Sequence, residues 1–168
     1  MKEFRITKYN PDKRDASGAY LDHDEWTSFT EVGTKLSEKE YHAVELNYIE
    51  AAIDLVSDQQ IKELTVLGLE DHNRSSNLTE GSKIEGREIE EVLRSLLREE
   101  YWCRLESEEA FIHIGWDYYM FVGVSEVRAE TKESILDRGL YIEDSISPYH
   151  PDECESGESG NGIRRAIS

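Results

Sequence analysis

The chain has 168 residues, of which 37 are Asp or Glu and only 19 are Lys or Arg, so its formal net charge is -18. Phosphate backbones and anionic lipid surfaces are bound mainly through Lys and Arg, so this charge argues against nucleic acid or a membrane as the main partner. With 38% hydrophobic residues at this length, the chain can bury a core, and we expect a single domain over residues 1–149.

The first expected element is a strand over residues 3–9, where apolar and polar side chains alternate. Asn10 and Pro11 break this pattern. Residues 10–24 then lack a clear period and predict a long loop, and residues 25–29 predict a short strand.

A helix is expected next, because Ser37 and Glu40 have the spacing of a capping box. Apolar residues recur at helical spacing from Tyr41 to Val56. The opposite face of this helix is acidic and carries Glu38, Glu45, Glu50, Asp54 and Asp58.

Residues 61–69 are a short apolar run closed by Gly and acids, which predicts a buried strand, and the polar residues 70–85 predict a loop. The succession of strand, helix and strand favours a mixed sheet. Residues 87–99 place their apolar side chains on one stripe and predict a second helix.

Three aromatic and β-branched runs predict an antiparallel meander over residues 101–106, 110–116 and 118–124. Ser125 is expected to cap a third helix, which Gly139 ends.

These elements, with a last strand over residues 140–146, predict an α/β fold of the α+β type. We expect about three helices packed on a mixed sheet of five to six strands, with the meander at its centre. After Pro148 the composition changes to Asp, Glu, Ser and Gly, so we expect residues 150–168 to be a disordered acidic tail.

The first ten residues lack the apolar segment of a secretory signal peptide, and no window approaches 18 apolar residues. Cys103 lies in an apolar run and Cys154 in the acidic tail, so a structural disulfide is not expected. A cytoplasmic location fits both observations.

Two loops place histidines beside acids, and this pattern allows a metal-dependent hydrolase as an alternative function. If the loops meet, His23, Asp71 and His72, with Asp24, could bind a divalent metal that activates water. Neither loop has the paired spacing of an established metal motif, so the sequence itself predicts no metal and no cofactor.

His113 and Arg104 lie in neighbouring strands of the predicted meander, and one sheet face could carry both. Such a pair could bind an anion or act as a general acid with an oxyanion stabiliser. The competing interpretation is a hydrogen-bonded His and an Arg that pairs with a carboxylate. The sequence lacks a nucleophile elbow, a phosphate loop and a dinucleotide motif.

The segments EFRITKYNP, GAYLDHDEWTSF, WCRLE and FIHIGWDYYMFVGV resemble those of small acidic cytosolic bacterial proteins of poorly characterised function. In size and acidity the chain is also similar to bacterial toxin-immunity proteins. This resemblance implies a cytosolic protein that binds another protein, and it carries no functional residue with it.

The leading hypothesis is a non-enzymatic acidic module that binds a basic protein, as an immunity protein neutralising a basic toxin or effector would. A stand-alone protein without a dedicated partner is a further alternative. The candidate binding residues are the acids of the first helix and the residues around Trp26: Asp22, Asp24, Glu25, Trp26, Glu38, Glu45, Glu50, Asp54 and Asp58.

Overall fold

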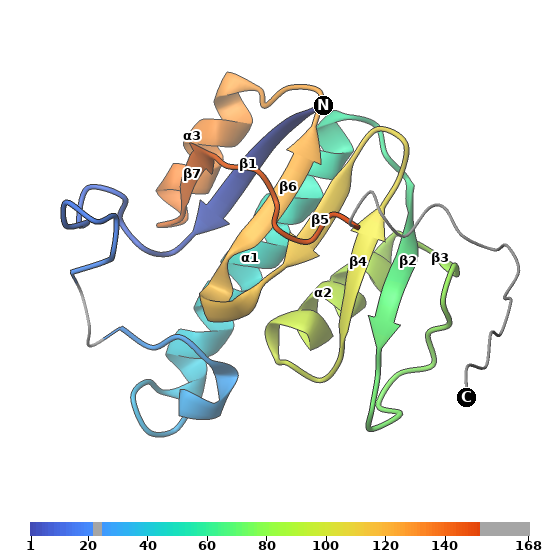
Figure 1. Ribbon diagram of the computed structural model, residues 1–168, viewed down its shortest axis with the longest axis horizontal. Helices are drawn as coiled ribbons and strands as arrows, with labels where there is room; N and C mark the ends of the chain where they lie inside the picture. Colours follow the sequence, from blue (N-terminus) through green and yellow to red (C-terminus); the bar gives the residue numbers. More distant parts are fainter. Residues whose placement is uncertain (22–24, 152–168) are drawn as a thin grey trace, which may run out of the picture.

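The computed structural model describes residues 1–21 and 25–151, and within these ranges the chain forms a seven-stranded sheet. The strands follow the order β3-β2-β4-β5-β6-β1-β7, and every neighbouring pair is antiparallel (Figure 1). Their bounds are β1 Lys2–Thr7, β2 Glu63–Glu70, β3 Lys83–Glu85, β4 Trp102–Glu106, β5 Phe111–Ile114, β6 Met120–Val124 and β7 Tyr141–Asp144.

The α+β class and the central meander β4-β5-β6 are confirmed, but the expected mixed sheet of five to six strands is wrong. Strands β1 and β2 do run in the same direction, as a strand-helix-strand succession implies. They never pair, because the three meander strands lie between them.

Two local predictions are also wrong. The segment expected to be a loop contains β3, which was missed because its three residues include only one apolar side chain, Ile84. The structure describes residues 25–29 and forms no strand there. A 3₁₀ turn, η1 (Phe29–Glu31), follows Ser28 instead. Ser28 and Glu31 cap this turn through their side chains, which favours a turn over an extended strand.

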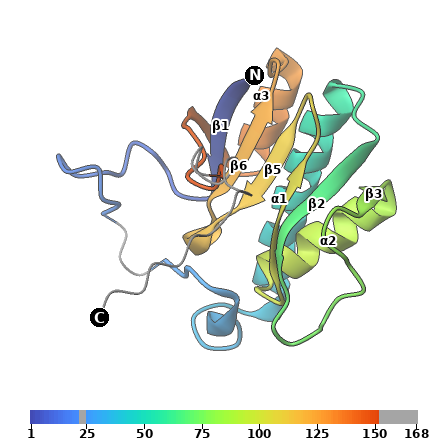
Figure 2. The ribbon, with the colours of Figure 1, turned by 45° about the vertical axis from the view of Figure 1, so that its right-hand side comes forward.

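Three helices pack on one face of the sheet (Figures 1 and 2). They are α1 (Glu38–Asp58), α2 (Arg87–Leu97) and α3 (Ala129–Asp137). The predicted capping box at Ser37 is present. The residue before α3 is Arg128, so the expected cap at Ser125 is wrong.

The core lies between this helical layer and the sheet. Alternate residues of the meander face the helices, and Leu105, Ile112 and Val122 have no exposed surface. Cys103 is buried among them as a free thiol, and burial raises its pKa to about 12. Such a thiol stays protonated and is a poor nucleophile. Cys154 lies outside the described residues.

The opposite face of the meander is crossed by residues 145–151, which we call the C-terminal strap (Figure 1). The backbone amide of Ser147 donates to the carboxylate of Glu3 at 2.9 Å, and Arg104 donates to the carbonyl oxygen of Tyr149 at 3.3 Å. These bonds attach the strap to β1 and to β4.

The strap extends two residues beyond residue 149, where the sequence placed the end of the domain. His150 Nε2 lies 3.0 Å from the Glu3 carboxylate, and its ring packs edge-on against Phe111 at 5.0 Å. The remainder of the predicted tail, residues 152–168, lies outside the described residues. In residues 1–21 and 25–151, no helix has both the length and the apolar character needed to cross a membrane.

Candidate functional site

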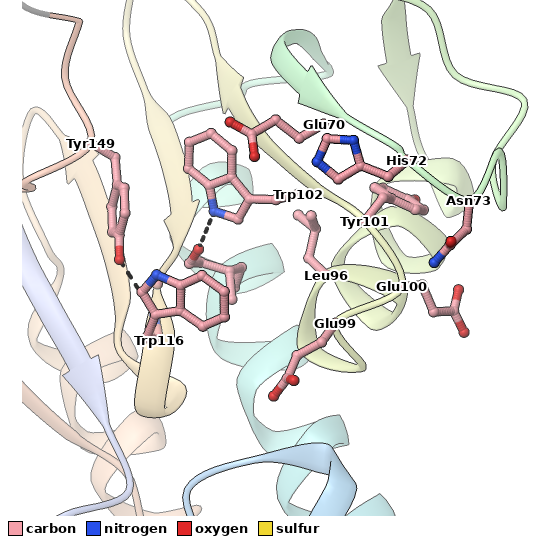
Figure 3. Close-up of a pocket in the computed structure, with 12 residues that line it drawn as sticks. Glu70, His72, Asn73, Leu96, Glu99, Glu100, Tyr101, Trp102, Trp116 and Tyr149 are labelled. Carbon is pink, nitrogen blue, oxygen red and sulfur yellow. Dashed lines mark hydrogen bonds between the residues drawn. The ribbon is translucent and has the colours of Figure 1, made fainter.

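A recess opens at one end of the meander, where β2 ends, β4 begins and β5 turns into β6 (Figure 3). Its volume is about 490 Å³, which lies in the range of ligand sites in proteins. Side chains from several separate segments line it, and those that carry the argument are Glu70, Glu99, Glu100, Trp102, Trp116 and Tyr149.

Three aromatic rings from different segments form one wall of the recess (Figure 3). Trp102 on β4 donates its indole N–H to the carbonyl oxygen of Ile114 at 2.8 Å, which ties the ring to the neighbouring strand. The rings of Trp102 and Tyr149 have centroids 5.5 Å apart. The Tyr149 hydroxyl accepts a long hydrogen bond of 3.4 Å from the backbone amide of Trp116. Contacts within the fold therefore position the rings of Trp102 and Tyr149, and the bond at Trp116 holds its backbone beside them.

The turn between β5 and β6 holds Trp116 outward through strained backbone. Asp117 and Tyr118 have φ of 58° and 59°, a left-handed region that is costly for a bulky side chain. The buried Tyr118 hydroxyl donates to the carbonyl oxygen of Leu97 at 2.8 Å and lies 3.2 Å from the hydroxyl of Tyr41. This anchor offsets the strain, and the result is a tryptophan with 75% of its surface exposed. Retained strain of this kind is typical of functional sites.

Three carboxylates stand at the rim of the recess. Glu70, Glu99 and Glu100 are all exposed. Glu99 accepts hydrogen bonds from the Ser28 hydroxyl at 2.9 Å and from the Phe29 backbone amide at 3.3 Å. Among the described residues, Glu70 and Glu100 form no ion pair. These two carboxylates therefore form no ion pair within the described chain, although the charge of Glu100 still acts on Arg98.

The loop after β2 brings His72 to the same rim. Asp71 orders this loop, because its carboxylate accepts four hydrogen bonds of 2.8 to 3.0 Å from Ser75 and Ser76. These bonds hold the pKa of Asp71 well below its ordinary value. The Ser75 hydroxyl also lies 3.0 Å from the carbonyl oxygen of Glu100, which places the loop beside the recess.

The predicted metal site depended on a meeting of two loops. Asp22, His23 and Asp24 lie outside the described residues. Asp71 already uses both carboxylate oxygens within its own loop. In the described ranges, no group of three or more His, Cys, Asp and Glu side chains could hold a metal ion.

His113 and Arg104 share a sheet face, as expected, and pair directly across β4 and β5. Both contact Glu106, at 3.1 and 3.3 Å. His113 Nδ1 lies 2.8 Å from the hydroxyl of Ser147. Because a carboxylate only accepts, Nε2 carries the imidazole proton and Nδ1 accepts from Ser147.

Burial lowers the pKa of His113, so the ring beside the carboxylate is neutral near pH 7. The hydrogen bond from His113 in turn lowers the pKa of Glu106. The Glu106 carboxylate therefore occupies the place that an added anion would take. This arrangement favours the structural interpretation of His113 and Arg104 over the catalytic one.

The acidic face predicted for α1 is partly buried. Glu45 has 4% of its surface exposed and accepts two hydrogen bonds from Arg98, at 2.6 and 2.9 Å. Arg94 approaches the same carboxylate at 3.4 Å. The expectation that Glu45 belongs to a free outer surface is wrong, because α2 packs against this side of α1.

Other acids of the predicted surface form ion pairs within the chain. Glu50 and Asp54 both pair with Arg138, at 3.0 and 2.8 Å. Asp58 pairs with Arg128, the residue before α3, at 3.2 Å. Glu38 is exposed and forms no ion pair with the described residues. The free negative charge of α1 is therefore smaller than the sequence suggests.

Trp26 is half-buried rather than an exposed anchor. Its ring packs edge-on against Tyr118 and Tyr41, with centroids 4.6 and 5.7 Å away. The ammonium of Lys8 lies 4.2 Å above the Trp26 ring and also pairs with Glu25. Trp26 thus contacts a cation of its own chain.

Comparison with protein-family models, with curated proteins and with solved structures finds no match for this chain.

Trp116 and Tyr149 are not among the functional candidates predicted from the sequence, because they come together only through the turn and the strap. One signal was present. Trp116 lies between Gly115 and Asp117, which is turn composition, and a large aromatic side chain in a turn has no strand neighbour to bury it.

Proposed function

We propose that this chain is a non-enzymatic protein-binding module whose partner is a basic protein. The observation that carries the proposal is the recess, where an exposed indole stands beside carboxylates that form no ion pair within the described chain. Buried aromatic anchors and electrostatic complementarity are common features of protein interfaces. A formal net charge of -18 would also speed the approach of a cationic protein.

An immunity protein that neutralises a basic toxin or effector belongs to this class, and a cytoplasmic location suits it. We propose the recess as the contact surface in place of α1. Four acids of α1 form ion pairs within the chain: Glu45, Glu50, Asp54 and Asp58. A protein without a dedicated partner would not need an exposed tryptophan on a strained turn.

The test is affinity capture on the immobilised chain from a lysate of its native host, at 50 and at 300 mM NaCl. We expect mass spectrometry to identify a retained protein with a pI above about 9. The purified partner should bind at least about tenfold more weakly at 300 mM than at 50 mM NaCl, because charge steers the association.

Two variants make this test specific to the recess. Trp116→Ala should lose most of the binding, whereas the pair Glu108→Gln and Glu109→Gln should keep it. This control pair removes two exposed charges from the β4-β5 turn, at the other end of the same strands. Absence of a basic protein at 50 mM NaCl would contradict the proposed function.

A further inference from the structure

We propose that the recess binds one arginine side chain of the partner, an inference that rests on the protein-binding function proposed above. The recess combines an aromatic wall with a rim of carboxylates. A guanidinium group can use both features at once, because it stacks on aromatic faces and donates hydrogen bonds in its own plane.

The aromatic wall offers ring faces to a planar cation. Figure 3 shows the ring of Trp116 next to that of Trp102, with Tyr149 beyond them on the strap. Trp116 is 75% exposed, so its face is available without rearrangement. Tryptophan is the strongest of the aromatic side chains in cation-π contacts.

The rim supplies acceptors for the guanidinium N–H groups. In Figure 3, Glu70 lies above Trp102 and Glu99 lies below Leu96, whereas Glu100 lies to the right of Leu96 with its carboxylate turned away from the aromatic rings. A methylated lysine would stack on the wall but has fewer donors, or none, for these carboxylates, and an anionic ligand would be repelled by them. Arginine presents five donors and therefore uses the rim best.

The chain uses the same pairing elsewhere within itself. The Arg5 guanidinium lies 4.8 Å above the ring of Tyr119, and that of Arg14 lies 4.7 Å above the ring of Tyr20. Both guanidiniums also contact the carboxylate of Glu143. The recess provides an aromatic face and carboxylates in the same way, but no arginine of the described ranges lines it.

The test uses four blocked Gly/Ser heptapeptides that differ only at the central residue, which is arginine, lysine, trimethyllysine or citrulline. Citrulline keeps the shape of arginine without its charge. Binding is followed through the indole N–H resonance of Trp116 in two-dimensional NMR spectra, with the resonance assigned by its loss in Trp116→Phe. We expect the arginine peptide to shift this resonance and to bind at least about fivefold more tightly than the citrulline and trimethyllysine peptides.

The variants separate the wall from the rim. Trp116→Ala should weaken binding of the arginine peptide by about fivefold or more, and Trp116→Phe should restore part of the loss. The pair Glu70→Gln and Glu100→Gln should weaken it to a similar extent. The matched pair Glu108→Gln and Glu109→Gln should stay within about twofold of the parent chain, since it changes the net charge equally but away from the recess.

Three results would overturn the inference. The first is equal affinity for the arginine and citrulline peptides, and the second is unchanged affinity in Trp116→Ala. The third is occupation by the chain's own C-terminal segment, which contains Arg164 and Arg165. In that case the Trp116 resonance would differ, without peptide, between the full chain and a chain that ends at Pro151.

The same measurements distinguish this failure from failure of the proposed function. If a basic protein binds at low salt while the arginine peptide shows no preference for the recess, only the arginine inference is wrong. If neither binds, both proposals are wrong.

Discussion

At the scale of single residues, the charge of a side chain and the role of that charge are separate questions. Glu45 lies on the predicted acidic face of α1, yet the structure buries it against Arg98. Glu38 lies on the same helix and is exposed. The difference depends on where α2 packs, and the residue pattern of α1 carries no information about that packing.

We predict that Glu45→Ala lowers the stability of the folded chain by about 2 kcal/mol, because it leaves the partly buried Arg98 without its carboxylate. For a chain of this size the melting temperature should fall by about 4 to 8 °C in calorimetry. Glu38→Ala is the matched control and should change stability by less than about 0.5 kcal/mol. Equal effects of the two substitutions would show that the buried ion pair is not important.

Gly115 gives a second prediction at this scale. A Cβ atom at this position would lie 2.5 Å from the hydroxyl oxygen of Tyr149, so Gly115→Ala must displace that ring. We expect weaker binding at the recess and a loss of about 1 kcal/mol in stability. In a chain that already carries Tyr149→Ala, the added Gly115→Ala should cost little, because the clash is gone. A double-mutant cycle measures this coupling, and strictly additive effects would contradict the explanation.

At the scale of elements, the C-terminal strap covers part of the sheet face that lies opposite the three helices. It covers the meander face that carries Phe111, His113 and Phe121, and it brings Tyr149 to within 5.9 Å of the Phe121 ring. A sheet face with this many apolar and aromatic groups needs a cover, and the strap is the element that provides one in the described chain.

We predict that a chain ending at Pro151 melts within about one or two degrees of the full chain, since the strap contacts remain. A chain ending at Asp144 lacks the strap and should melt several degrees lower, with increased binding of a hydrophobic dye. The comparison of the two melting temperatures is the measurement. A loss of several degrees in the longer form would show that residues 152–168 contribute to the folded domain.

At the scale of the whole molecule, stability should depend on pH through the groups beneath the strap. Burial lowers the pKa of His113 from its ordinary value of 6.5, so the unfolded chain takes up a proton there first as the pH falls. Stability should therefore decrease as the pH falls below about 6.5, by at most about 1.4 kcal/mol per pH unit for one proton.

A second loss of stability should begin as the pH falls below about 4.5. The hydrogen bond from His113 lowers the pKa of Glu106, and for Glu3 the contacts from Ser147 and His150 outweigh the opposite effect of burial. Urea unfolding from pH 8 to pH 3 measures both steps. His113→Gln should flatten the slope between pH 6.5 and 5.5, and an unchanged slope in this variant would assign the pH dependence to other groups.

The sequence by itself determined the elements whose signals are local. The capping box at Ser37, the apolar stripe of α2 and the alternating runs of the meander each depend on neighbours a few residues apart. The α+β class followed from these patterns. The strand β3 was missed because three residues are too short for a period to appear.

Only the tertiary structure decided the strand order, the pairing of charges and the recess. The order depends on which strands fill the space between β1 and β2, and no local pattern encodes it. The recess needs Trp102, Trp116 and Tyr149 together, although 33 residues separate the last two along the chain. Contacts at that separation arise from packing of the whole sheet and its strap, so residue spacing alone could not predict them.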